Sequence, residues 1–251
     1  MQERAKTRPL EFARFTPPQL AYLQDQSRFK LMRGGNQVGK SFAQVSELVW
    51  RCMGEHPYIE VPPAPTECWL VCHSWEQSLS LQDKIWEVLP KDLIHPDTEY
   101  NPGRGFRGKV PIISFKNGSR LRIKTTNQGS LGVASATISF VGIDEPPPRA
   151  IWGELSARVL RAGNLGGVGL TMTPVGRPCG WLQDMCEAGL IKDHPAPLTV
   201  ENVTPEGGLP MLTQEQIDDV AARYLPMDRP QRLLGEWNGP TEGRTFEAFE
   251  S

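Results

Sequence analysis

The stretch from Arg33 to Ser41 reads RGGNQVGKS and has the spacing of a P-loop, the glycine-rich loop that wraps a phosphate chain. This pattern has structural meaning only between a strand and a helix. Both are predicted here, because residues 29–32 (FKLM) indicate a short apolar strand and Phe42 to Met53 carries apolar side chains at helical spacing. The sequence therefore predicts a strand, a P-loop and a helix in succession.

The loop residues have the chemical types that phosphate binding requires. Glycine accepts backbone angles that a Cβ forbids, so successive N–H groups can point at one anion, and the helix that follows adds the positive end of its dipole. In this pattern the amino group of Lys40 reaches the β- and γ-phosphates, and the hydroxyl of Ser41 binds Mg²⁺. We therefore expect ATP and Mg²⁺, with the nucleotide contacted by Arg33, Gly34, Gly35, Asn36, Gln37, Val38, Gly39, Lys40, Ser41 and Phe42.

A second informative segment runs from Thr137 to Glu145, reads TISFVGIDE and ends in two carboxylates. In a parallel sheet such a strand end lies beside the phosphate loop. Asp144 would hold Mg²⁺, mainly through water, because this ion keeps several of its waters. Glu145 would accept a proton from the attacking water or orient it, which is worth roughly 10²- to 10⁴-fold in rate. Lys40 and Glu145 are thus the predicted catalytic residues; the alternative without function is a solvated turn before three prolines.

Composition fits one large α/β domain or two small ones. The chain has 251 residues, 39% of them hydrophobic and 22% charged, and is long enough to bury a full core. No apolar run approaches the roughly 20 residues of a membrane span, and MQERAKTRPL lacks the apolar core of a signal peptide, so we expect no membrane partner and a protein that acts in a cytoplasm. The cysteines form no CxxC pair and are expected to be buried as small hydrophobic residues: Cys52, Cys68, Cys72, Cys179 and Cys186.

Charge is unevenly distributed, although the net charge is only −2. The segment from Tyr100 to Ile143 has no Asp or Glu, whereas the C-terminal third is acidic. The basic residues of that segment are Arg104, Arg107, Lys109, Lys116, Arg120, Arg122 and Lys124. They indicate either a surface that faces phosphates or an acidic partner, or a solvated hairpin face, and both interpretations stay open. The candidate DNA contacts among them are Lys116, Arg120, Arg122 and Lys124.

The rest of the chain alternates strands with helices, which favours an α/β fold with a mainly parallel sheet and flanking helices. Thr171 and Thr173 would place hydroxyls at a strand end, within reach of the γ-phosphate. The expected elements are a helix opened by Pro17 and Pro18, a strand at Cys68–Cys72, a helix from Trp75 to Leu89 capped by Ser74, a flexible loop from Asn101 to Gly108, a hairpin of residues 112–115 and 120–123 that interrupts the alternation, a helix from Arg149 to Leu160, a loop from Gly163 to Gly167, a strand from Val168 to Pro174, a helix from Gly180 to Leu190, a short strand from Leu198 to Val200, and a helix from Thr213 to Tyr224.

Together, these motifs resemble the N-terminal ATPase domain of the large terminase of tailed bacteriophages, the motor that packs DNA into procapsids. The resemblance covers about residues 12–240 and rests on Gln19, GGNQVGKS, the strand ending IDEPPP, the Thr-Met-Thr-Pro strand and the closing GEWNGP. It implies a P-loop NTPase with a RecA-like sheet and an inserted β-hairpin. A glutamine amide has a donor and an acceptor edge, which suits adenine, and the resemblance implies that role for Gln19. It also implies that Thr171 to Thr173 couple hydrolysis to movement.

The same resemblance implies partners and a place of action. These are double-stranded DNA, a homo-oligomeric ring on a portal protein, and a small terminase subunit, all in the cytoplasm of a host bacterium. Two positions depart from many relatives: a basic P-loop residue is replaced by Asn36, and an arginine before the acidic strand is replaced by the segment 131–134 (LGVA). An arginine finger is worth about 10³- to 10⁵-fold, so we expect a substitute. The candidates are Arg33 within one subunit and Arg104, Arg107, Arg149, Arg158 and Arg161 from a neighbour.

We predict an ATPase domain over residues 1–235, with an adenine-side segment at 1–28 and a P-loop core with a small C-terminal lid at 29–235. Residues 236–251 would form a linker toward a nuclease domain, and no nuclease activity is expected because the sequence lacks a carboxylate cluster for two metal ions.

A helicase-like ATPase would need a second motor domain, a GTPase would need an Asn/Thr-Lys-x-Asp motif that is absent, and a kinase would gain little from Glu145. The alternatives kept are a nucleic-acid-dependent, helicase-like P-loop ATPase and a nucleotide-binding assembly module with little activity of its own.

Overall fold

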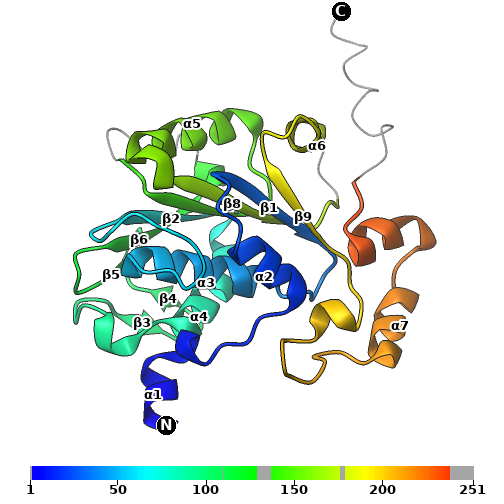
Figure 1. Ribbon diagram of the computed structural model, residues 1–251, viewed down its shortest axis with the longest axis horizontal. Helices are drawn as coiled ribbons and strands as arrows, with labels where there is room; N and C mark the ends of the chain where they lie inside the picture. The colour runs from blue at the N-terminus through cyan, green and yellow to red at the C-terminus, as the bar shows by residue number, and fades with distance from the viewer. Residues whose placement is uncertain (1, 109, 129–136, 176–178, 238–251) are drawn as a thin grey trace, which may run out of the picture.

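The structure, a computed structural model, describes residues 2–108, 110–128, 137–175 and 179–237. Within these residues, seven strands form one sheet and two short strands form a separate hairpin (Figure 1). The strands are β1 (Phe29–Gly34), β2 (Glu67–Cys72), β3 (Tyr100–Asn101), β4 (Gly105–Phe106), β5 (Ile112–Ser114), β6 (Arg120–Thr125), β7 (Phe140–Asp144), β8 (Gly167–Met172) and β9 (Lys192–Ala196).

The sheet has the order β5-β6-β2-β7-β8-β1-β9, and all of its pairings are parallel except that between β5 and β6. This confirms the predicted α/β class. The P-loop strand β1 lies between β8 and β9, and Asp144 at the end of β7 is in register with Thr171 of β8. Because these strands are parallel, their carboxyl ends lie along one edge of the sheet, beside the P-loop.

Helices cover both faces of the sheet. Figure 1 shows α2, α3 and α4 on one side and α5 and α6 on the other. One buried cluster joins α3 and α4 to β2 and β6, while a second joins α5 and α6 to β7 and β8. The helices are α1 (Gln2–Thr7), α2 (Pro17–Leu23), α3 (Lys40–Met53), α4 (Trp75–Val88), α5 (Arg149–Val159), α6 (Gly180–Glu187) and α7 (Gln214–Ala222), with short helical turns at Pro9–Glu11, Lys91–Leu93, Thr126–Gln128, Leu160–Leu165, Glu201–Val203, Pro226–Asp228 and Pro230–Leu234.

Helix α3 follows the P-loop directly and begins at Lys40, as the prediction of a helix immediately after the loop requires. The glycines on either side of it, Gly39 and Gly54, have φ angles of 81° and 73°, a left-handed conformation that favours glycine. Ser74 caps α4 as expected, because its hydroxyl accepts a hydrogen bond from the N–H of Gln77 (3.3 Å). Both helices that border the site are therefore fixed by local sequence.

The predicted basic hairpin is confirmed, with Ile113 opposite Leu121. Strand β6 also pairs in parallel with β2, so the hairpin forms one edge of the main sheet. The loop expected from Asn101 to Gly108 is corrected in part, because it contains most of the β3–β4 hairpin, which packs Phe106 and Tyr100 around Trp86.

The strand predicted at Leu198–Val200 is wrong. The edge strand is β9, which ends two residues before Leu198, and its sequence is polar and contains a proline. An edge strand needs neither an apolar pattern nor every N–H group, so sequence periodicity did not reveal it. Two further boundaries shift: the loop expected from Gly163 to Gly167 is mainly a helical turn, and the helix expected to reach Leu190 ends at Glu187.

Residues 197–237 form a C-terminal segment beside β9, drawn in yellow and orange at the right of Figure 1. Ile217 of α7 belongs to a buried cluster with Phe15 and Met32, which joins this segment to the N-terminal residues and to β1. Thr213 caps α7 through a capping box, as predicted.

Four of the five cysteines are buried as expected, whereas Cys186 is only partly buried, and all five are free thiols. None of the described helices is long and apolar enough to cross a membrane.

Candidate active site

The P-loop lies closely packed between β9 and the C-terminal segment. A Cβ on Gly34 would come within 2.3 Å of the carbonyl oxygen of Ala196, and one on Gly35 within 2.4 Å of that of Leu233. Gly39 stands in the left-handed region, where side chains are strained. These three positions therefore require glycine for different reasons, two of them for close packing and one for backbone conformation.

The backbone of the loop fits a phosphate chain. Gly35 and Asn36 donate their N–H groups to the carbonyl oxygens of Ala196 (3.1 Å) and Arg232 (2.9 Å). Within the described residues, no acceptor takes a hydrogen bond from the next five N–H groups, those of Gln37 to Ser41. They begin in the loop and continue into the first turn of α3, where N–H groups have no partner inside the helix. This run of donors forms an anion site.

Lys40 is a partly buried cation held by neutral oxygens. Its amino group donates to the carbonyl oxygens of Gly34 (3.1 Å) and Gly35 (2.6 Å) and to the hydroxyl of Thr173 (3.0 Å). Burial lowers the pKa of Lys40 to about 8, although Glu145 and Asp144 act in the opposite direction. All three of these hydrogen-bond acceptors are neutral, so a phosphate would supply a direct negative partner for the amino group.

Asp144 lies at the end of β7 and accepts hydrogen bonds from the Thr171 hydroxyl (3.1 Å) and the Gln77 amide (3.2 Å). Burial raises the pKa of Asp144, and the bond from Thr171 and the charge of Lys40 offset this only in part. A partly buried carboxylate that lacks an ion-pair partner among the described residues fits a divalent cation. Together with the Ser41 hydroxyl at the start of α3, it is the donor set predicted for Mg²⁺.

Glu145 has a φ angle of 66°, which costs a residue with a Cβ of order 1–3 kcal/mol. Its N–H donates to the Thr171 carbonyl (2.9 Å), and its carboxylate accepts from the N–H of Thr173 (3.1 Å). The Thr173 hydroxyl in turn donates to the Asn36 side chain (3.2 Å) and accepts from Lys40. Thr173 therefore connects the carboxylate of Glu145 to the P-loop.

These groups line a cavity of about 300 Å³, whose walls include Asn36, Glu145 and Thr173. Further polar residues line the cavity that the sequence did not indicate as site residues, and these are His73, Gln77, Cys179 and Arg232. The position of Gln77 could have been predicted, because it lies in the first turn of the helix after β2, and β2 neighbours β7. Arg232 carried none, because it lies far from the motifs and is brought to the P-loop by the C-terminal segment.

Gln19 lies where its amide touches the P-loop. Its side-chain oxygen accepts from the N–H of Thr16 (2.8 Å), and its side-chain nitrogen donates to the Gly39 carbonyl (2.9 Å). To hold adenine with both edges, Gln19 would exchange these two bonds, so that role stays a prediction. The Phe42 ring contacts Phe15 at 5.4 Å between ring centres, on the same side of the loop.

The candidate arginines are placed as follows. Arg33 donates to the carboxylate of Asp193 (2.8 and 3.1 Å) and lies over the Trp237 ring (4.7 Å), so it would have to break an ion pair to reach a phosphate. Arg104, Arg149 and Arg161 are exposed, Arg107 pairs with Glu99 (2.7 Å), and Arg158 is partly buried. None of these lines the cavity that contains Glu145. The segment 131–134 lies outside the described residues.

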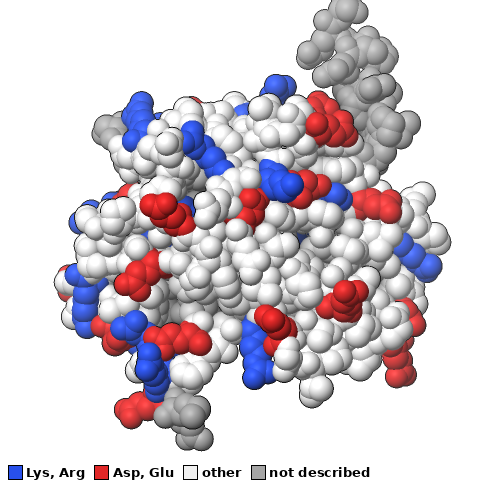
Figure 2. Space-filling view, in the orientation of Figure 1, with Lys and Arg blue, Asp and Glu red and all other residues white. Residues whose placement is uncertain are grey.

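The candidate DNA contacts lie at the β5–β6 edge. Arg120, Arg122 and Lys124 alternate with buried residues on β6 and so share one face of the sheet. Arg122 pairs with Glu67, Lys124 lies over the Trp69 ring (5.2 Å), and Lys116 is exposed in the turn. On the face shown in Figure 2, basic and acidic side chains are interspersed. Lys109 lies outside the described residues.

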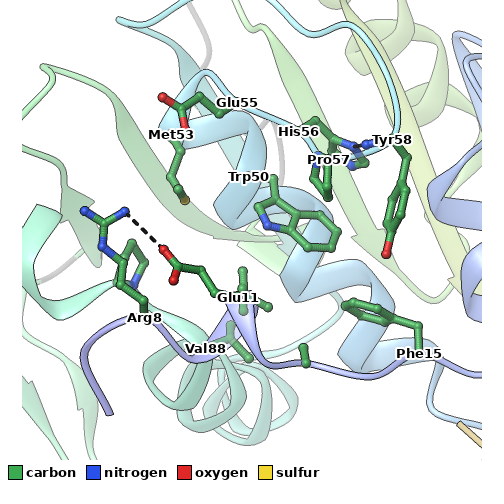
Figure 3. A pocket seen from close by; sticks show the side chains of 13 residues that line it. Arg8, Glu11, Phe15, Trp50, Met53, Glu55, His56, Pro57, Tyr58 and Val88 are labelled. Atoms are coloured by element: carbon green, nitrogen blue, oxygen red, sulfur yellow. Dashed lines mark hydrogen bonds and ion pairs between the residues drawn. The ribbon is translucent and has the colours of Figure 1, made fainter. Parts of the chain in front are cut away.

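A second cavity, of about 470 Å³, lies away from the P-loop, between the N-terminal residues and the end of α3. Figure 3 shows Phe15, Trp50 and Tyr58 around it, with Arg8 and Glu11 at its rim. No P-loop residue lines this cavity, so it is separate from the site described above.

No family model and no curated protein matches the sequence. Solved structures do match. The large terminase ATPase domain of Thermus phage P74-26, in its unmutated form and as an arginine-to-alanine mutant, is 15% identical at a TM-score of 0.58, over 88% of this chain and 92% or 93% of that chain. The large terminase of a thermophilic bacteriophage in complex with ADP is 13% identical at 0.62, over 89% of this chain and 54% of that one. The HK97 bacteriophage large terminase is 14% identical at 0.59, over 90% and 51%.

These likenesses concern the fold. The chain spans about half the length of the ADP-bound terminase chain and of the HK97 terminase chain, and almost the whole of the P74-26 ATPase domain. Its seven-stranded sheet, with the P-loop between β1 and α3 and an acidic pair at the end of β7, agrees with that match. The chain therefore has the RecA-like P-loop fold of the ATPase domains of bacteriophage large terminases.

Proposed function

We propose that this protein is the ATPase motor domain of a viral large terminase and couples ATP hydrolysis to the movement of double-stranded DNA into a procapsid. The observation that supports this best is the chain of contacts from Lys40 through Thr173 to Glu145. A P-loop needs a lysine for its anion, but a catalytic carboxylate joined to it through a strand-end threonine suits hydrolysis by water. The fold shared with terminase ATPase domains supports the same proposal.

In the proposed reaction, water adds to the γ-phosphorus, the bond to the β,γ-bridging oxygen breaks, and that electron pair leaves with ADP. Glu145 accepts the proton of the water and is aimed by its bond from the Thr173 N–H. The N–H groups of residues 37–41, which have no acceptor in the part of the chain that the structure describes, and the amino group of Lys40 bind the phosphates. Asp144 and Ser41 would hold Mg²⁺, which neutralises charge on the β- and γ-phosphates when bound.

Coupling is proposed to run through Thr171 and Thr173. Thr171 donates to Asp144, while Thr173 binds Glu145, Asn36 and Lys40. Both hydroxyls therefore contact side chains that would lie beside the phosphates. Loss of the γ-phosphate would leave Lys40 and Glu145 with different partners and change the hydrogen bonds at the end of β8. The chain continues from β8 to Cys179 and α6, which gives the change a path along the chain.

The partners follow from the same proposal. They are double-stranded DNA, further copies of this chain in a ring on a portal protein, and a small terminase subunit, in the cytoplasm of an infected bacterium. The residues named for the basic edge, Lys116, Arg120, Arg122 and Lys124, are the proposed DNA contacts. Gln19 is proposed to contact the adenine.

The test is ATP hydrolysis by the whole chain at several protein concentrations, with and without linear double-stranded DNA. Lys40→Ala is compared with Lys6→Ala, which removes an exposed lysine of α1. We expect DNA-stimulated hydrolysis that is lost in Lys40→Ala and kept in Lys6→Ala. Hydrolysis that rises more than linearly with concentration would support a ring. Nucleotide binding without DNA-stimulated turnover at any concentration would contradict a motor and favour the assembly module.

A further inference from the structure

The P-loop of this chain contains only one cationic side chain beyond its first residue. Asn36, at its centre, is neutral, and both ends of its amide are hydrogen-bonded: the nitrogen donates to the Tyr224 hydroxyl (3.0 Å) and the oxygen accepts from Thr173 (3.2 Å). Charge that develops on the transferred phosphoryl group would therefore meet Lys40 alone from within this loop. Transition states of this kind gain from a second cation.

The C-terminal segment places an arginine, Arg232, directly against the P-loop, and this residue is a candidate for the second cation. The Arg232 carbonyl accepts the N–H of Asn36 (2.9 Å), and the Leu233 carbonyl lies so close to Gly35 that a Cβ there would clash. Leu233 also accepts a hydrogen bond from the N–H of Leu198 (2.6 Å), next to β9. The short turn Pro230–Leu234 is thus tied to the P-loop by its main chain.

The side chain of Arg232 lines the same 300 Å³ cavity as Glu145 and Thr173. Its guanidinium lies over the Tyr224 ring, 5.1 Å from the ring centre, and its only ion pair in the described residues is a long one, 3.9 Å, to Asp228. The side chain is 33% exposed. By contrast, Arg33 is 11% exposed and is held by two close contacts to Asp193. Arg232 therefore has a positioned charge that no close carboxylate of the described residues neutralises.

We propose that Arg232 is a further catalytic residue, whose guanidinium contacts the γ-phosphate of ATP bound to the P-loop of the same chain. This rests on the proposed function. Arg232 gains and loses no proton; it neutralises charge on the phosphoryl oxygens while the bond to the β,γ-bridging oxygen breaks. Because the turn that carries Arg232 also binds the P-loop, the cation is present only when the C-terminal segment is seated there.

The experiment compares the wild-type chain with Arg232→Ala, Arg232→Lys and, as a matched control, Arg223→Ala, which removes an exposed arginine at the end of α7. Steady-state hydrolysis gives kcat and KM, and binding of ADP is measured with and without aluminium fluoride, which mimics the transferred group. We expect Arg232→Ala to lower kcat by about 10²- to 10³-fold with little change in KM or in ADP affinity. Added guanidinium should restore part of the activity of Arg232→Ala, and Arg232→Lys should fall between.

Three results would overturn the proposal. They are wild-type kcat in Arg232→Ala, an equal loss of affinity for ADP with and without aluminium fluoride, and a loss of activity that follows a lower melting temperature and is not rescued by guanidinium. If the wild type does not hydrolyse ATP, the proposed function fails. The measurements of ADP binding with and without aluminium fluoride still test whether Arg232 contacts the γ-phosphate position. Weaker binding of ADP with aluminium fluoride alone would then support the contact, and absence of any nucleotide binding would refute both.

Discussion

Helix α3 contributes residues to two groups of charges, and the carboxylates of the two groups behave in opposite ways. The phosphate end consists of Lys40, Asp144 and Glu145, at the carboxyl edge of the sheet. The buried charge cluster consists of Lys30, Glu47, Arg51 and His56, deeper along β1 and α3 and just beyond α3. In the cluster, Glu47 accepts from Arg51 (2.7 Å) and contacts His56 (3.0 Å) and Lys30 (3.3 Å).

The cluster is buried and the phosphate end is partly buried, and their charges are compensated differently. Burial opposes the ionisation of Glu47, but Lys30, Arg51 and the bond to His56 together hold its pKa well below its usual value. At the phosphate end burial prevails: it raises the pKa of Asp144 and lowers that of Lys40. The cluster is complete within the chain, whereas Lys40 and Asp144 keep charges that a ligand would balance.

The largest effect is expected at the phosphate end. Glu145→Gln keeps the shape of the side chain but removes the proton acceptor, so kcat for ATP should fall by about 10²- to 10⁴-fold. The melting temperature and the affinity for ADP should stay at wild-type values, because the amide oxygen can still accept the bond from the Thr173 N–H. Glu154→Gln, on the exposed face of α5, is the control. Turnover that survives Glu145→Gln would remove Glu145 as the catalytic base.

The buried charge cluster should respond in the reverse sense. Glu47→Gln leaves Lys30 and Arg51 buried without a counter-charge, which should cost about 3–5 kcal/mol of unfolding free energy. Urea unfolding measures this, again with Glu154→Gln as control. Below its melting temperature the variant should still hydrolyse ATP. If Glu47→Gln loses little stability but much of its kcat, the contrast between a stabilising cluster and a catalytic phosphate end is wrong.

The same cluster predicts a pH dependence. The folded-state pKa of Glu47 is lowered, so its stabilisation is present above its unfolded value, near 4.5, and is lost as the pH falls further. The gap in unfolding free energy between wild type and Glu47→Gln should therefore be constant from pH 7 to about 5 and shrink below about pH 4.5. Unfolding curves between pH 7 and 3.5 test this. A gap that widens on acidification would show that Glu47 is not held ionised.

The smallest effect is expected at the exposed basic edge, where water screens each charge. Lys116→Glu with Arg120→Glu reverses two exposed charges and leaves Arg122 and Lys124 with their partners Glu67 and Trp69. If these residues bind DNA phosphates, the apparent affinity for DNA should fall and its salt slope should drop by about 1 per lost contact. Basal hydrolysis without DNA should be unchanged. An unaltered DNA dependence would leave the hairpin as a solvated face.

The sequence was a good guide wherever local chemistry decides structure. The P-loop requires glycine at residues 34, 35 and 39, Ser74 and Thr213 cap the helices that follow them, and apolar runs mark the buried strands β2, β7 and β8. It was a poor guide at β9, where an edge strand tolerates polar residues and Pro195. It also missed β3 and β4, because two-residue strands have no periodicity to read.

What the sequence determined by itself is the set of groups that carry fixed chemistry: Lys40 and Ser41 on a glycine loop, and Asp144 and Glu145 after a buried strand. Tertiary structure decided which groups face them. It brought Thr173 between Lys40 and Glu145, placed Gln77 on Asp144, and committed Arg33 to Asp193 while laying Arg232 against the P-loop. The physical reason is that residue type and local spacing fix what a side chain can do, whereas its partners depend on contacts between segments up to two hundred residues apart, which no local pattern encodes.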